Sequence, residues 1–120
     1  MTKKNMNIGS GGVCVVADFE AVKEETMRYT NEVRRQLPVE KAILFGSYAN
    51  GTATEWSDID IAFFLRDYGG KTRFDIGVEL LGLCRGYKKC IEPHVFDIAE
   101  IERDNPFVNE ILSSGVEILP

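Results

Sequence analysis

The stretch FGSYANGTATEWSDIDIAFF, residues 45–64, places two aspartates inside a run of apolar residues. Burying an ionised carboxylate is unfavourable unless a counter-charge meets it, so Asp58 and Asp60 require an explanation. In an extended strand, residues two apart lie on the same face, roughly 6.5–7 Å apart along the backbone. We therefore expect Asp58 and Asp60 to point the same way, while Ile59 and Ile61 point into the core.

Two carboxylates on one rigid face repel each other unless a cation lies between them. Oxygen ligands of this kind suit Mg²⁺, which commonly takes one or two carboxylates together with substrate phosphates, and Mn²⁺ accepts the same ligands. The pattern thus predicts a divalent-metal site at Asp58 and Asp60. Taken alone, the same Asp-x-Asp pattern also fits the solvated face of a half-buried strand.

A glycine-rich turn precedes the aspartates. Gly46 and Ser47 follow KAILF, residues 41–45, which is typical of a short buried strand, and SYAN, residues 47–50, can begin a helical turn before Gly51. Glycine allows a close backbone approach, and the N–H groups at a helix N-terminus attract phosphate. The loop and the strand together predict a nucleoside triphosphate held by Mg²⁺, although a lone Gly-Ser pair is equally typical of a plain tight turn.

Helical and extended patterns alternate along the rest of the chain. Apolar residues at near-helical spacing predict a helix over residues 18–37, and a capping box at Thr72 and Asp75 opens another that ends near Gly86. That helix carries Phe74, Val78, Leu81 and Cys84 on one face.

Further strands are predicted over residues 58–65, 90–96 and 116–119. Pro93 gives the second of these an edge position or a bulge, because proline donates no backbone hydrogen bond. Asn105 and Pro106 start a last helix, which ends at Gly115.

The composition is that of one soluble domain. Of the 120 residues, 44% are hydrophobic and 28% charged. We expect residues 1–12 to form a mobile tail and residues 13–120 a single domain. A net charge of −5 argues against a surface that grips nucleic acid, and no apolar run approaches the length of a membrane span. The 3 cysteines lack metal-ligand spacing, which predicts reduced thiols in a cytoplasmic protein.

The segment GSYANG, followed after a spacer of about ten residues by DID, resembles the minimal nucleotidyltransferases of the DNA polymerase beta-like superfamily. The resemblance is specific from Lys41 to Phe64 and continues more weakly through IEPHVF and NPFVNEIL. It implies an α+β fold (a two-layer α/β arrangement) with a mixed sheet of about four strands packed with helices.

The resemblance also implies a two-metal transfer of a nucleotidyl group. Asp58 and Asp60 would hold both ions, and Gly46 and Ser47 would bind the triphosphate. A third acid from a later strand would bind one ion and help activate the attacking hydroxyl. We favour Glu92 for this role by its strand position, with Asp97, near the strand's far end, as the competitor. His94 shares the face of Glu92 and is assigned no role.

One residue departs from the family pattern. Many relatives carry arginine where this chain has Asn50. If that arginine supports the loop or a phosphate, its replacement weakens catalysis or changes the acceptor.

The acceptor is inferred from chain length and resemblance. Little of the chain lies beyond the nucleotide-binding core, so a partner subunit or a second copy is expected to recognise the acceptor. Minimal members of this type work as antitoxins beside a helical HEPN ribonuclease, which implies transfer of AMP from ATP to a tyrosine of the toxin. Two alternatives are a homodimer that modifies a small molecule such as an aminoglycoside, and a non-catalytic module that binds nucleotide or holds a partner.

Overall fold

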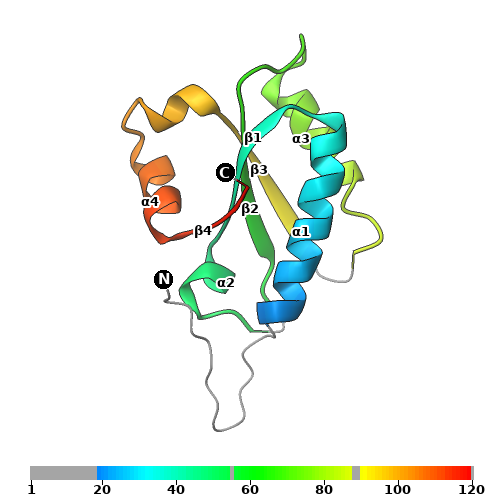
Figure 1. Cartoon of the computed structure of the whole chain (residues 1–120), viewed down its shortest axis with the longest axis vertical. Helices are drawn as coiled ribbons and strands as arrows, with labels where there is room; N and C mark the ends of the chain where they lie inside the picture. Colours follow the sequence, from blue (N-terminus) through cyan, green and yellow to red (C-terminus); the bar gives the residue numbers. More distant parts are fainter. Residues whose placement is uncertain (1–18, 55, 88–89, 120) are drawn as a thin grey trace, which may run out of the picture.

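The computed structural model describes residues 19–54, 56–87 and 90–119, so the predicted tail at residues 1–12 lies outside the described residues. Figure 1 shows the helices and strands in their chain order. Among the described residues, no helix is both long enough and apolar enough to cross a membrane. The elements are α1 (Phe19–Gln36), β1 (Val39–Phe45), α2 (Ser47–Asn50), β2 (Ile59–Leu65), α3 (Arg73–Gly82), β3 (Ile91–Asp97), the 3₁₀ helix η1 (Ile98–Ile101), α4 (Pro106–Ser114) and β4 (Val116–Leu119).

The four strands form one mixed sheet in the order β3-β2-β1-β4. Strand β1 runs antiparallel to β2 and to β4, whereas β2 and β3 are parallel. The predicted mixed sheet of about four strands is therefore confirmed. Strand β3 lies at the edge, as Pro93 predicted, because an edge strand tolerates a residue without a backbone N–H.

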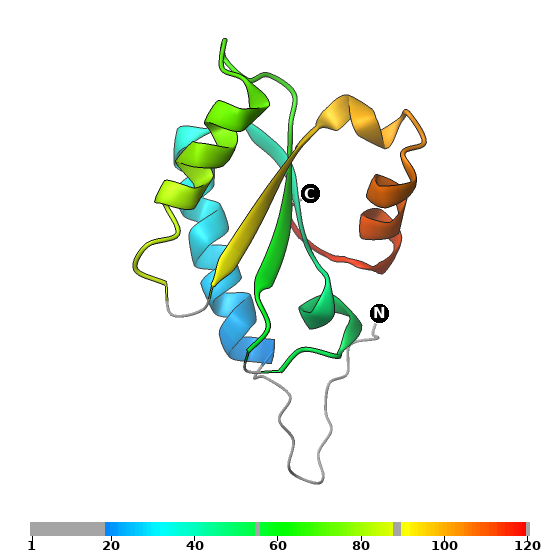
Figure 2. The same ribbon diagram turned by 180° about the vertical axis from the view of Figure 1, so that it is seen from behind.

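Helices cover both faces of the sheet (Figures 1 and 2). Ile59, Ile61 and Phe63 of β2 point into a core shared with α1 and α3. Ala62 and Phe64 point the other way, into a second core shared with α4. Burial on both faces explains why β2 is almost continuously apolar. The second face is covered only in part, since Asp60, the next residue along it, is half-exposed.

Helix α3 turns an unexpected face outward. Its capping box at Thr72 and Asp75 is present as predicted, but the helix ends at Gly82 rather than near Gly86. Phe74, 78% exposed, lies on the outside, and so do Val78 and Leu81. The buried residues of α3 are instead Ile76 and Leu80. The helix has apolar residues on two sides, and the tertiary packing selects the side that is buried.

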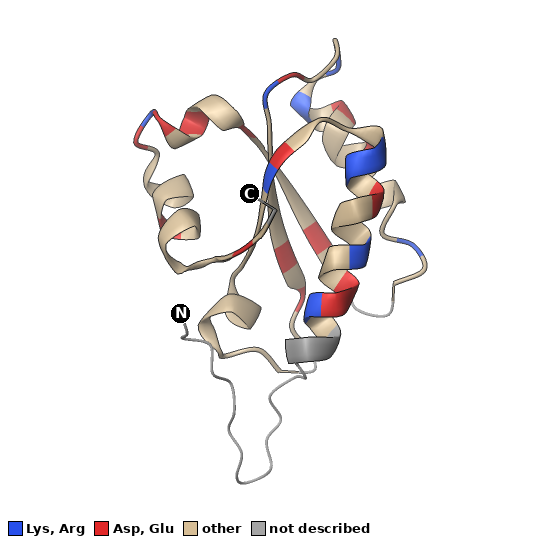
Figure 3. Cartoon of the chain, viewed as in Figure 1, with Lys and Arg blue, Asp and Glu red and all other residues tan. Residues whose placement is uncertain are grey.

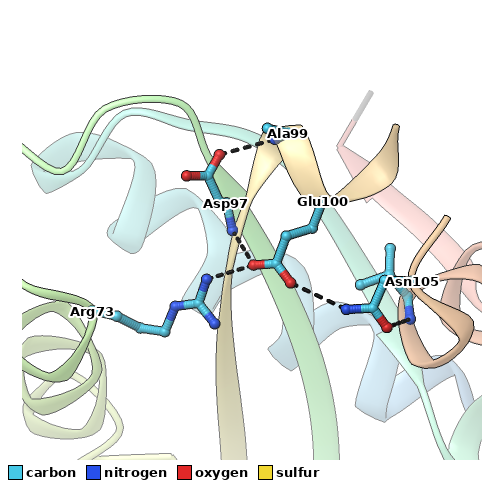
Figure 4. Close-up of polar contacts among 6 residues, drawn as sticks. Arg73, Asp97, Ala99, Glu100 and Asn105 are labelled. Carbon is cyan, nitrogen blue, oxygen red and sulfur yellow. Dashed lines mark hydrogen bonds and ion pairs between the residues drawn. The ribbon is translucent and has the colours of Figure 1, made fainter. Parts of the chain in front are cut away.

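A buried carboxylate holds one end of the sheet together (Figure 4). Glu100 of η1 accepts hydrogen bonds from the backbone N–H of Asp97 at 3.1 Å and from the Asn105 amide at 3.3 Å, and it pairs with Arg73 of α3. Burial raises the pKa of Glu100, but the hydrogen bonds from Asp97 and Arg73 outweigh it and lower that pKa. The Glu100 network thus connects α3, β3, η1 and α4.

Candidate active site

Phe45, Asp60 and Glu92 lie next to one another on neighbouring strands, on the sheet face that also carries Ala62 and Phe64. Asp60 is in register with Phe45 of β1 on one side and with Glu92 of β3 on the other. Paired residues on neighbouring strands point to the same face, and so does His94, two residues after Glu92. Figure 3 shows acidic segments side by side on β2 and β3. The pairing of β2 with β3 therefore brings together two acids that are far apart in the sequence.

Ligand atoms of Asp60, Glu92 and His94 lie within 4.8 Å of one another. The His94 Nε2 atom is 3.3 Å from Asp60 Oδ1 and 3.8 Å from Glu92 Oε1. His94 had been assigned no role from the sequence. The signal that could have found it is its two-residue spacing from Glu92, which places both residues on one strand face.

Asp58 is adjacent to this group of three rather than part of it. It precedes β2 and is half-exposed. Burial and then the neighbouring Asp58 carboxylate raise the pKa of the Cys90 thiol, and the Asp58 charge also contributes to raising the pKa of Glu92. Asp58 is thus close enough to the other acids to interact with them electrostatically. Of the cysteines in the described residues, Cys84 and Cys90 are both free.

The two central acids are electrostatically coupled. Burial raises the pKa of Asp60, but hydrogen bonds with His94 and Glu92 outweigh it and lower that pKa. The pKa of Glu92 moves upward instead, because of its hydrogen bond with Asp60, its burial and the charge of Asp60. In the part of the chain that the structure describes, no lysine or arginine forms an ion pair with either acid. The site therefore favours a cation from outside the chain.

The backbone of Gly46 brings the glycine-rich turn into close contact with Asp60. Its backbone has φ +79° and ψ −151°, a region that only glycine adopts readily. A Cβ atom at this position would lie 2.5 Å from Asp60 Oδ2, well inside van der Waals contact. Ser47 then opens α2, where the backbone N–H groups of Ala49 and Asn50 donate to the Gly46 carbonyl at 3.0 Å and 3.1 Å. The turn predicted to bind phosphate therefore lies directly against a predicted metal ligand.

The side chain of Asn50 forms hydrogen bonds within its own loop. Its Oδ1 atom accepts hydrogen bonds from the Thr52 backbone N–H at 3.2 Å and from the Thr52 hydroxyl at 2.7 Å. Asn50 thus stabilises the turn after α2.

Asp97, the competitor for the third acid, is held at the far end of β3. It pairs with Leu65 in the sheet, and its Oδ1 atom accepts a hydrogen bond from the Ala99 backbone N–H at 2.9 Å, which caps η1. Glu92 lies beside Asp60 and remains our prediction for the third acid.

Residues 28–120 match the family model described as polymerase beta, nucleotidyltransferase. The chain belongs to this nucleotidyltransferase family. No curated protein is significantly similar to the chain in sequence. The family assignment and the mixed sheet with its helices confirm the polymerase beta-like nucleotidyltransferase fold.

Two solved structures share the fold. One is a protein from Sulfolobus solfataricus described as a candidate nucleotidyltransferase, with a TM-score of 0.56 and 24% identity over 71% of this chain and 75% of that one. The other is a chain from a structure described as a toxin-antitoxin with AMP-PNP, with a TM-score of 0.50 and 17% identity over 80% of this chain and 71% of that one. At these identities the likeness concerns the fold.

A nucleotidyltransferase fold implies use of a divalent metal, and the residues present fit one. Two carboxylates and an imidazole can each offer a ligand atom within 4.8 Å of the others. Carboxylate oxygens suit Mg²⁺ and Mn²⁺, and imidazole suits the transition metals in addition. Among the described residues neither Asp60 nor Glu92 pairs with a lysine or arginine, so these acids attract a cation.

Proposed function

We propose that this nucleotidyltransferase transfers AMP from ATP to a hydroxyl acceptor, with Mg²⁺ held by Asp58, Asp60 and Glu92. The observation that carries the proposal is the convergence of Asp60, Glu92 and His94 beside the Gly46 turn. Two bound ions supply charge neutralisation for an in-line displacement at the α-phosphate. Mn²⁺ fits the same oxygen ligands.

In this proposal each residue of the chain has a defined task. Gly46 and Ser47 bind the β- and γ-phosphates through backbone N–H groups and the Ser47 hydroxyl, and so orient the leaving pyrophosphate. Glu92 accepts the proton of the attacking hydroxyl, a role favoured by its exposure at the edge strand beside Asp60. His94 orients the Asp60 carboxylate from the Oδ1 side.

We also propose a protein acceptor, a tyrosine of a HEPN-type toxin to which this chain would be the antitoxin. The support is the fold shared with a chain of a toxin-antitoxin structure described with AMP-PNP, a non-hydrolysable analogue of ATP. The acidic chain, with a net charge of −5, is compatible with docking to a more basic partner.

The test is transfer of label from ATP labelled at the α-phosphate, with Mg²⁺, into proteins of the native host's lysate. Wild type is compared with Asp60→Asn and Glu92→Gln, which are close in shape but remove a carboxylate. Asp97→Asn is the matched control, because Asp97 is an acid of the same strand that caps η1. We expect a labelled band with wild type and Asp97→Asn, and at least a 100-fold weaker band with the other two, in line with the loss of a metal ligand or a base.

Equal labelling by wild type and Asp60→Asn would contradict the proposed site. Equal labelling by Glu92→Gln, with loss in Asp97→Asn, would transfer the role of the third acid to Asp97. Labelling of a small molecule instead of a protein would contradict the toxin acceptor but keep the activity. Melting temperatures of all variants, measured without metal, show whether a loss of labelling comes from misfolding.

A further inference from the structure

The outward side of α3 carries apolar side chains that the described chain leaves uncovered. Phe74, Val78 and Leu81 are each more than half exposed, and their spacing of three and four residues keeps them on one side of the helix. We call these three residues the α3 stripe. An exposed patch of neighbouring apolar side chains often marks an interaction site, so the α3 stripe is a candidate contact surface.

Two glycines come after the α3 stripe in the sequence, and both are exposed. Gly82 ends α3, and Gly86 lies in the turn that follows. A Cβ atom at either position would meet nothing within 4 Å, so packing within the described chain requires a glycine at neither place. Gly86 has φ +89°, which favours glycine, but Gly82 has no such φ, and glycine is a poor helix residue. Gly82 therefore leaves space on the helix surface that nothing in the described chain uses.

The exposed side of α3 is complementary to itself when the direction of the helix is reversed. Counted outward from Leu80, Val78 and Gly82 are each two residues away, and Phe74 and Gly86 are each six residues away. Reversal about this centre thus places large apolar side chains opposite glycines. Two antiparallel helices related by a two-fold axis meet in this way, since residue i of one copy contacts residue j of the other and j contacts i.

The charges of α3 follow the same symmetry. Asp75 and Arg85 are each five residues from Leu80, and both are exposed. Neither belongs to an ion pair among the described residues. Reversal about Leu80 therefore places an acid opposite a base at two points of the contact. Opposite charges that face each other across a contact favour and orient the association.

We propose that α3 pairs with α3 of a second copy of this chain, antiparallel and across a two-fold axis at the same centre. Val78 then packs over Gly82 of the second copy, and Asp75 forms an ion pair with Arg85 of the second copy. The inference is independent of the proposed function, because it uses none of the residues of the candidate active site.

The dimer leaves the candidate active site accessible. Helix α3 packs through Ile76 and Leu80 against the sheet face opposite the one that carries Asp60. Figure 2 shows α1 and α3 on one side of the sheet and α4 on the other. The contact is small beside a standard interface of about 1,600 Å², so we expect a dissociation constant in the micromolar range.

The experiment measures self-association of the full chain by sedimentation velocity at concentrations from about 1 to 500 μM, which bracket the micromolar range. Wild type should shift from monomer to dimer as its concentration rises. Arg85→Glu, Gly82→Leu and Phe74→Ala should each raise the dissociation constant at least tenfold. The first substitution places like charges opposite each other, the second fills the space that Val78 of the second copy occupies, and the third removes apolar area.

Two further variants make the test specific. Phe107→Ala is the matched control for Phe74→Ala, because Phe107 is an exposed phenylalanine on α4, and it should associate as wild type does. Asp75→Lys combined with Arg85→Glu exchanges the two charges, so it should bring the dissociation constant back to within about threefold of wild type.

Melting temperatures measured below the dissociation constant show whether each variant is folded. Phe74→Ala should there unfold as wild type does, because the monomer leaves this side chain in solvent. Gly82→Leu should melt no lower than wild type, because leucine is the better helix residue. A higher dissociation constant without a lower melting temperature therefore reports the contact and not the fold.

Three outcomes would overturn the inference. Wild type that stays monomeric at every concentration would show that a second copy does not cover the α3 stripe. A dimer that the three α3 variants weaken no more than Phe107→Ala does would place the interface elsewhere on the chain. Weakening by Arg85→Glu that the exchanged charges leave uncorrected, in a folded variant, would rule out the antiparallel pairing of Asp75 with Arg85.

Discussion

The contact between Gly46 and Asp60 allows a quantitative prediction for Gly46→Ala. The backbone conformation at φ +79° and ψ −151° costs a residue with a Cβ atom about 1–3 kcal/mol. The new Cβ would also lie 2.5 Å from Asp60 Oδ2, so the carboxylate must move by about 1 Å to reach an ordinary contact. A displacement of about 1 Å at a reacting centre can cost about 100-fold in rate.

We therefore expect Gly46→Ala to lower the melting temperature by roughly 5–15 °C, taking about 4–6 °C per kcal/mol for a domain of this size. Labelling activity should fall about 100-fold under conditions where the variant is folded. The assay is thermal unfolding in the absence of metal, together with label transfer from ATP. Gly51→Ala is the control. Gly51 also has a positive φ of +84°, but its Cβ would meet nothing within 4 Å.

A double-mutant cycle with Asp60→Ala separates the two costs. Removing the Asp60 carboxylate relieves the clash but not the backbone strain, so Gly46→Ala should be less destabilising in the Asp60→Ala background by about 1 kcal/mol or more. Gly51→Ala should cost the same in both backgrounds. If Gly46→Ala costs the same in both backgrounds within about 0.5 kcal/mol, the carboxylate does not rest against the turn and the reasoning is refuted.

Two further predictions concern stability. Glu100→Gln should destabilise the fold by about 1–3 kcal/mol at pH 7, because it removes the charge from a buried, hydrogen-bonded group. Since the folded pKa of Glu100 is lowered from 4.5, its stabilisation is present above the unfolded pKa and is lost as the pH falls through the folded pKa. Urea unfolding should therefore show the difference from wild type shrinking below about pH 4, and a constant difference would contradict this. Tyr29→Phe should cost about 1 kcal/mol, because the buried Tyr29 hydroxyl donates to the Leu80 carbonyl at 2.6 Å. Urea unfolding beside Phe74→Ala, an exposed substitution expected to cost much less, tests it, and equal costs would contradict it.

Local chemistry made several features of the fold predictable from the sequence. The capping box at Thr72 and Asp75 and the start of α4 at Asn105 depend on contacts within a few residues. Pro93 predicted an edge strand because it lacks a backbone N–H. The α3 face was less predictable, because Phe74 and Ile76 are both apolar and periodicity alone does not say which side meets the sheet.

The sequence by itself determined the type of site, through the Gly-Ser turn and the spacing of the two aspartates, since both lie within one continuous segment. Only the tertiary structure decided which side chains meet. The parallel pairing of β2 with β3 places Asp60 opposite Glu92 and adds His94, whereas Asp58 remains adjacent and Asp97 caps η1. The register between strands from distant parts of the chain depends on core packing along their whole length, and no local motif encodes it.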